Sequence, residues 1–207
     1  MAEFTFYTVA MSRGQIARWA LHEAGAEYEQ VVFNWQTRPE NFKQINPMNK
    51  VPALVHHHGG HDHVVTECAA ICHYLAETHP QAGLLPDAHE KAAYFRWLFF
   101  AAGPMEQAVV AKAMGWEVPE GRTGMAGFGS LELTLNAIDE WLSATDFAAG
   151  DRFTMADVYL GSQFIWGLRF GSIPERPSFR AYVERLTQRP QYREGLAIDE
   201  ALIKAAS

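Results

Sequence analysis

The run Asn-Lys-Val-Pro-Ala-Leu at residues 49–54 sets the architecture that we expect for the whole chain. Pro52 has no N–H to give to a ladder, so a strand begins there or lies at a sheet edge. If the Val51–Pro52 bond is cis, the N–H and C=O of Val51 turn outward instead of into the sheet. Outward-facing backbone groups suit the backbone of a small peptide, and Val51 is therefore a candidate binding residue.

A second strand, expected around residues 64–65, forms a hairpin with the strand after Pro52 and leads into Thr66-Glu67-Cys68. Helical spacing then begins at Ala69. The N-terminus of a helix offers unpaired N–H groups and a positive dipole end, and it attracts a carboxylate. The hairpin thus predicts a backbone clamp beside an anion site. The alternative is an ordinary hairpin followed by a helix.

The first third of the chain alternates strands with helical segments. The expected order is β-α-β-(short α)-β-β-α, which suits a mixed sheet with one parallel half and one antiparallel hairpin half. The parallel crossover should be right-handed. The expected segments are strands at 3–8 and 28–33, a helix at 15–24, a short helix or turn at 38–45, strands on both sides of Gly59-Gly60, and a helix through Glu77.

Beyond a segment rich in proline and glycine, no strand pattern appears. Pro104 should kink or divide a helix, and Thr154 with Asp157 forms a capping box at a helix start. Pro190 should stop the last helix. The expected helices cover 90–114, 131–142, a segment from Thr154, and 177–189, with a glycine-rich loop at 118–129. The predicted domains are 1–79 and 90–207, joined by a linker at 80–89.

Composition excludes several classes of function. The formal charge of −7 over 207 residues argues against nucleic acid and against an anionic membrane surface as partners. No apolar run approaches the roughly 20 residues of a membrane span. We see no signal peptide, so we expect a cytoplasmic protein. Cys68 and Cys72 are the only cysteines; they form no C-x-x-C pair, and a disulfide between them is not expected.

The motifs resemble, in this order and spacing and over nearly the whole chain, those of the glutathione S-transferase family. The resemblance implies an α/β thioredoxin-like N-terminal domain that binds glutathione as co-substrate. It also implies an all-α C-terminal domain that helps to bind a small hydrophobic electrophile, and a cytosolic homodimer. The motifs are Phe42–Pro47, Lys50–Leu54, Glu67–Ile71 with Tyr74-Leu75, Phe153–Asp157 and Arg189-Pro190.

The family's glutathione-binding residues carry over motif by motif. Pro52 matches the cis-proline, and Val51 matches the residue whose backbone pairs with the cysteinyl unit. Glu67 and Cys68 match a Glu-Ser pair that holds the γ-glutamyl end, with Cys68 in place of serine. A lost hydroxyl hydrogen bond costs on the order of 1 kcal/mol. Lys50 faces the glycyl carboxylate in this reading, or is a solvated lysine in the alternative.

Two hydroxyls are candidates to stabilise the glutathione thiolate. A free thiol has a pKa of about 8.5, so little is ionised at neutral pH. Ser12 lies in the turn before the first helix, as in serine-type transferases, and Tyr7 lies late in the first strand, as in tyrosine-type ones. We favour Ser12, because its hydroxyl and the N–H groups of the helix start converge. A plain N-cap is the alternative role for Ser12.

The remaining patterns are weaker. The histidines around Gly59-Gly60 should form a polar, solvent-facing turn rather than a zinc or nickel site, so no metal is expected. Apolar residues of the helical domain could line an electrophile pocket or simply fill the core; they are Met105, Met114, Trp116, Phe164 and Trp166. The predicted function is glutathione conjugation. The alternatives are glutathione-dependent peroxide or disulfide reduction and a non-catalytic scaffold that carries ligands.

Overall fold

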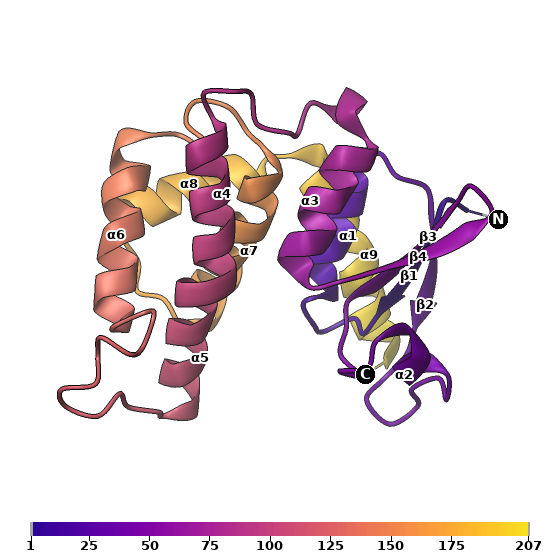
Figure 1. Ribbon diagram of the computed structural model, residues 1–207, viewed down its shortest axis with the longest axis horizontal. Helices are drawn as coiled ribbons and strands as arrows, with labels where there is room; N and C mark the ends of the chain where they lie inside the picture. The colour runs from indigo at the N-terminus through magenta and orange to yellow at the C-terminus, as the bar shows by residue number, and fades with distance from the viewer. Residues whose placement is uncertain (1, 207) are drawn as a thin grey trace. The chain divides into compact units, whose positions relative to one another are not determined.

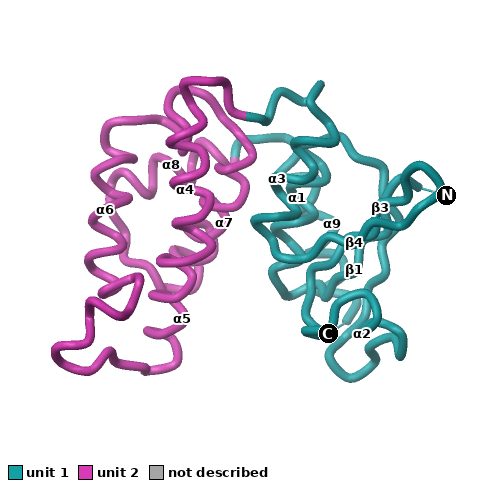
Figure 2. Tube along the Cα trace, in the orientation of Figure 1, with its two compact units in different colours: residues 1–85, 188–207 teal, residues 86–187 magenta. Residues whose placement is uncertain are grey.

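A computed structural model describes residues 2–206 of the chain. These residues form two compact units, shown in different colours in Figure 2. Unit 1 comprises residues 1–85 and 188–207, and unit 2 comprises residues 86–187. In this grouping the described residues from Gln188 onward cluster with the N-terminal unit rather than with residues 86–187.

The sheet of unit 1 has four strands in the order β2-β1-β3-β4. β1 runs parallel to β2 and antiparallel to β3, and β3 and β4 form an antiparallel hairpin. Gly59 and Gly60 both have positive φ, at 60° and 80°, as a tight hairpin turn requires. The mixed sheet expected from the sequence is therefore confirmed. Its strands are Phe4–Thr8 (β1), Tyr28–Val32 (β2), Ala53–His58 (β3) and His61–Thr66 (β4).

The helices of unit 1 include one that the sequence pattern did not predict. Figure 1 shows α1 and α3 together beside the sheet, with α9 packed against α1. We expected a helix over 177–189 that stops at Pro190; a helix there does end before that residue, at Thr187, but a further, unpredicted helix, α9, begins at Pro190. A proline fits the first helical position, where its fixed φ is suitable and its missing N–H is not needed. The helices are Gly14–Ala24 (α1), Phe42–Ile45 (α2), Cys68–Thr78 (α3), Pro80–Ala82 (η1) and Pro190–Ala206 (α9).

Side chains of β1 alternate between the two faces of the sheet. Phe4 and Phe6 are fully buried, and the Arg18 guanidinium of α1 lies 5.2 Å from the Phe6 ring centroid. Tyr7 points to the other face, where it packs against a cluster that includes Phe42 of α2. The sheet thus has a core on each face, which is the thioredoxin-like arrangement.

Unit 2 is all-helical. Pro104, expected to kink a helix, lies in a π-helical turn between α4 and α5, as is common where the regular hydrogen-bond pattern is interrupted. Met105 and Phe164 are fully buried core residues, whereas Met114 and Trp116 are about 60% exposed or more. No helix among residues 2–206 is long and apolar enough to cross a membrane. The elements are Lys91–Phe100 (α4), Ala101–Met105 (η2), Glu106–Met114 (α5), Leu131–Ala144 (α6), Met155–Phe170 (α7) and Pro177–Thr187 (α8).

Candidate glutathione site

The turn before α1 holds the Ser12 hydroxyl in place. Its Oγ donates to the Val9 carbonyl at 2.6 Å and accepts from the Gly14 N–H at 3.0 Å, and the side chain is buried. Gly14 must be glycine, because a Cβ there would lie 1.9 Å from Thr8 Oγ1. The close approach of α1 to the end of β1 therefore fixes the serine at the start of the helix. The sequence pattern gave no sign of the Thr8–Gly14 contact.

The start of α3 is tied to this turn. The Cys68 thiol donates to the Arg13 carbonyl at 3.6 Å, so α3 begins beside the residue that follows Ser12. Glu67, which precedes α3, is exposed and has a φ of 67°. For a residue with a Cβ this backbone conformation costs of order 1–3 kcal/mol, and such strain clusters at functional sites. The structure thus brings Glu67, Cys68 and Ser12 into one region.

The loop before β3 carries the third part of the candidate site. The Val51–Pro52 bond is cis, and β3 pairing begins only at Ala53. The Val51 side chain packs on the cluster of Val9 and Phe42, which joins this loop to the Ser12 turn. Asn46, to which the sequence analysis gave no role, braces the loop: its Nδ2 donates to the Lys50 carbonyl at 2.7 Å, and its Oδ1 accepts from the Met48 N–H at 3.0 Å.

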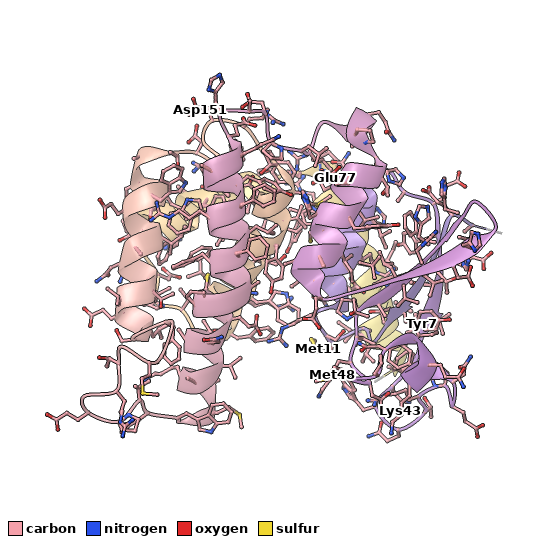
Figure 3. The ribbon with its side chains drawn as sticks, in the orientation of Figure 1. Tyr7, Met11, Lys43, Met48, Glu77 and Asp151 are labelled. Atoms are coloured by element: carbon pink, nitrogen blue, oxygen red, sulfur yellow. The ribbon has the colours of Figure 1, made fainter. Side chains whose placement is uncertain are left out.

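Tyr7 and Ser12 have different surroundings. Figure 3 shows Tyr7 close to α2, and its ring lies 5.5 Å from that of Phe42. Burial, and to a lesser extent the charge of Asp62, raises the pKa of Tyr7. Its phenol is therefore protonated at neutral pH and belongs to the cluster beneath α2. Lys50 is exposed.

A cavity of about 470 Å³ opens beside the Ser12 turn within unit 1. Met11 and Trp35, at its edge, are each about half exposed, and Figure 3 labels Met11 at this end of the unit. The residues that line it in the described chain include no Asp, Glu, Lys or Arg. They are Val9–Met11, Val32–Trp35, Thr37, Leu202, Ile203 and Ala206. The sequence analysis missed this cavity, because it sought an apolar pocket in the helical domain and did not predict α9.

The Asn34 side chain at the cavity makes hydrogen bonds within the loop over residues 34–37. Asn34 Oδ1 accepts the N–H groups of Gln36 and Thr37 at 2.9 and 2.8 Å. Arg38 does not line the cavity, and its guanidinium lies 5.5 Å from the centroid of the Trp35 ring. The cavity wall is therefore uncharged and mostly apolar, and it suits an uncharged, hydrophobic molecule.

The histidine-rich hairpin is only partly the exposed turn that we expected. His58, His61 and His63 are exposed and His57 is half-buried, but His56 is buried, stacked on Phe4 and hydrogen-bonded to Tyr74 at 2.8 Å. Burial lowers the pKa of His56. Among residues 2–206 no group of three or more His, Cys, Asp or Glu side chains is arranged to hold a metal ion.

Family models match both parts of the chain. The glutathione S-transferase N-terminal domain matches residues 2–77, and the C-terminal domain matches residues 98–190. The rat maleylacetoacetate isomerase is 34% identical over 74% of this chain and 72% of that protein. The chain belongs to the glutathione S-transferase family. Glutathione S-transferase F13 of Arabidopsis thaliana is 29% identical over 83% of this chain and 84% of its own.

Solved structures of the family have the same fold. A glutathione transferase of Methylococcus capsulatus aligns with a TM-score of 0.78 and 26% identity, over 96% of this chain and 99% of that one. A sphingomonad glutathione S-transferase, solved in complex with glutathione, aligns with a TM-score of 0.76 and 25% identity, over 95% and 98%. The expected fold class, thioredoxin-like α/β followed by all-α, is thereby confirmed.

Proposed function

We propose that this family member is a glutathione transferase that joins the glutathione thiolate to small hydrophobic electrophiles. The observation that carries this proposal is the buried Ser12 hydroxyl at the start of α1, with the start of α3 hydrogen-bonded to the adjacent residue. The apolar cavity next to that turn supports a second, hydrophobic substrate.

Glutathione would be bound by backbone groups and by one helix start. The Val51 N–H and C=O, before the cis-proline, would pair with the cysteinyl unit. Glu67 would take the γ-glutamyl ammonium, and the Cys68 N–H at the start of α3 would take its carboxylate. Lys50, which is exposed at the end of the loop braced by Asn46, would meet the glycyl carboxylate.

Ser12 would stabilise the thiolate by turning its hydroxyl. A serine has one O–H to donate, and here it goes to the Val9 carbonyl. Redirecting it to sulfur exchanges a neutral hydrogen bond, worth about 1 kcal/mol, for a stronger charge-assisted one. Lowering the thiol pKa by about 2 units takes roughly 2.7 kcal/mol. The positive end of α1 would supply the rest.

One observation favours this function over the isomerisation named for the rat relative. Maleylacetoacetate carries carboxylate groups, and a site for it would be expected to offer cations. The residues lining the cavity, as far as the chain is described, include no lysine or arginine, so we propose conjugation in preference to isomerisation. Peroxide or disulfide reduction at the same site, and a ligand-carrying role, are the other outcomes to test. A cytoplasmic homodimer remains our expectation.

The test combines binding with turnover. Titration calorimetry should show that the protein binds glutathione, and mixing with 1-chloro-2,4-dinitrobenzene should then give the S-aryl conjugate. Binding with reduction of cumene hydroperoxide but no conjugation would support the peroxidase alternative. Binding with neither reaction would support the scaffold. The absence of any affinity for glutathione would end the proposal.

A further inference from the structure

The C-terminal helix α9 supplies one wall of the cavity beside Ser12. Leu202, Ile203 and Ala206 line it. Asp199 lies three and four residues before Leu202 and Ile203, so all three share one face of the helix. A contact that fixes the position of Asp199 therefore also fixes the position of the Leu202 and Ile203 side chains in the cavity wall.

Asp199 is held by a buried ion pair with α1. Arg18 Nε lies 2.9 Å from Asp199 Oδ1, and the two side chains are 0% and 1% exposed. Arg18 Nη1 also donates to Tyr28 Oη at 3.0 Å and to Gln30 Oε1 at 2.8 Å. Three elements, α1, β2 and α9, thus meet at one guanidinium.

The Arg18–Asp199 pair leaves some of its hydrogen-bonding capacity unused, which is unfavourable if its role is only to stabilise the fold. Within residues 2–206, Arg18 Nη2 and Asp199 Oδ2 are buried without a hydrogen-bond partner. A buried ion pair is weak evidence for stability, because removing two charges from water offsets much of their attraction. Its better-supported use is to select one arrangement among alternatives.

The pair sits one helical turn from both sides of the proposed site. Arg18 follows Gly14, whose N–H binds the Ser12 hydroxyl, by four residues on α1. α9 lies directly on α1 here: a Cβ on Gly195 would lie 3.7 Å from the Trp19 backbone and from Arg18 Cγ. Figure 1 shows the two helices side by side. The ion pair therefore joins the serine turn to the apolar wall.

We propose that Arg18 and Asp199 are positioning residues that hold the Leu202–Ile203 wall at the distance from Ser12 that a hydrophobic electrophile requires. This inference rests on the proposed function, which places the electrophile in this cavity. Neither residue touches substrate in this proposal. Losing the pair would weaken the fit of the electrophile and leave the glutathione contacts unchanged, since Val51 and Glu67 belong to other elements.

A second ion pair offers a matched control. Arg189, just before α9, makes two 2.6 Å contacts to the buried Glu23 of α1. Ile203 is fourteen residues further on, or about 20 Å along a helix. Glu23→Gln should therefore reduce stability without moving the cavity wall.

The experiment compares Asp199→Ala, Asp199→Asn and Glu23→Gln at pH 7.5, using glutathione and 1-chloro-2,4-dinitrobenzene. We expect Asp199→Ala to raise the KM for the electrophile about fivefold or more, with the KM for glutathione changed less than about twofold. Asp199→Asn keeps an acceptor for Arg18 and should have a smaller effect. Glu23→Gln should change neither constant. An unchanged electrophile KM in folded Asp199→Ala, or an equal rise in Glu23→Gln, would overturn the proposal.

Two further measurements keep the inference testable on its own. If Asp199→Ala does not fold, the Leu202→Ala/Ile203→Ala double variant should show the same selective rise in electrophile KM, and no rise would overturn the proposal. If the wild type shows no turnover, the proposed function fails. Quenching of Trp35 fluorescence by the aryl halide, taken as wild type minus Trp35→Phe, then measures cavity binding directly. A loss of affinity of about fivefold in Asp199→Ala supports positioning, and no loss refutes it.

Discussion

Two helix starts of unit 2, those of α6 and α7, differ from the α1 and α3 starts of unit 1 in the side chains that satisfy their N–H groups. In unit 2, Ser130 Oγ accepts the Leu133 N–H at the start of α6, and Thr154 and Asp157 cap α7 reciprocally. In unit 1, as described, α1 and α3 follow Arg13 and Glu67, which make no side-chain cap. The starts of α6 and α7 are thus closed by side chains at the helix start itself, whereas the residues directly before α1 and α3 contribute no side-chain cap.

Ser12 is a partial exception to this contrast, because its side chain does bind the start of α1. It does accept the first N–H of α1, but it does so from two residues before the helix, and its own proton goes to a backbone carbonyl. A cap of this kind keeps a donor that can be redirected to a thiolate. The comparison therefore predicts that removing a cap in unit 2 affects stability, while removing Ser12 chiefly affects chemistry.

The largest effect should follow from Asp157→Ala. This fully buried carboxylate accepts from the Thr154 N–H at 2.8 Å, the Thr154 hydroxyl at 3.1 Å, the Ala148 N–H at 2.7 Å and the Tyr182 hydroxyl at 2.8 Å. Alanine would leave these donors buried and unpaired, so the free energy of unfolding should fall by roughly 3–5 kcal/mol. Urea denaturation measures it. Glu132→Gln, at an exposed position of α6, should stay within about 0.5 kcal/mol; a similar small change in Asp157→Ala would contradict the contrast.

The buried carboxylate of Asp199 in unit 1 should make the free energy of unfolding depend on pH. Burial raises the pKa of Asp199 from 3.8 to about 6, although Arg18 opposes this. Because the folded pKa is the higher one, the stabilising contribution of Asp199 is complete below about pH 4 and is lost as pH rises through 6.

Comparison with Asp199→Asn isolates this titration. Relative to the variant, the wild type should lose up to about 3 kcal/mol of unfolding free energy between pH 4 and pH 8. Urea titrations of both proteins across this range measure the difference. A gap between the two proteins that does not vary with pH would show that the carboxylate titrates normally in the folded chain.

Ser12→Ala tests the chemical side of the contrast. We expect kcat for the aryl halide to fall at least about tenfold, since one donor to the developing thiolate is lost. The pKa of the bound glutathione thiol, followed by thiolate absorbance, should rise. Tyr7→Phe is the matched control, and it should change both quantities little, because the phenol lies in the cluster with Phe42. A large loss in Tyr7→Phe with little change in Ser12→Ala would reverse the assignment.

The parts of the fold that depend on local patterns were predictable from the sequence. The Gly59-Gly60 turn, the strand after Pro52 and the capping box at Thr154 each depend on residues close together in the chain. The proline in η2 was expected to disturb a helix and does so. α9 was not predicted, because a proline at a first helical position and one that ends a helix look alike without the packing partner.

Only part of the candidate site could be predicted from local sequence patterns. Ser12 and Val51 could be named from motifs, but the cavity joins residues nearly 200 positions apart, from Val9 to Ala206. Such a cavity depends on how α9 lies on α1. The Arg18–Asp199 contact has the same origin, and no spacing in the sequence indicates it. His56 was expected among exposed histidines, yet the pairing of β3 with β1 places it opposite Phe4.

The smallest effect should come from Ser130→Ala, which removes the cap of α6. Its hydroxyl is exposed and satisfies one N–H at 3.1 Å, so the free energy of unfolding should fall by about 1 kcal/mol. Affinity for glutathione and kcat should not change, since the helix start is closed and in unit 2. Urea denaturation and steady-state kinetics on one preparation measure both. If Ser130→Ala impaired catalysis as much as Ser12→Ala, the starts of α6 and α1 would not differ in function, and a special role of the Ser12 hydroxyl would be contradicted.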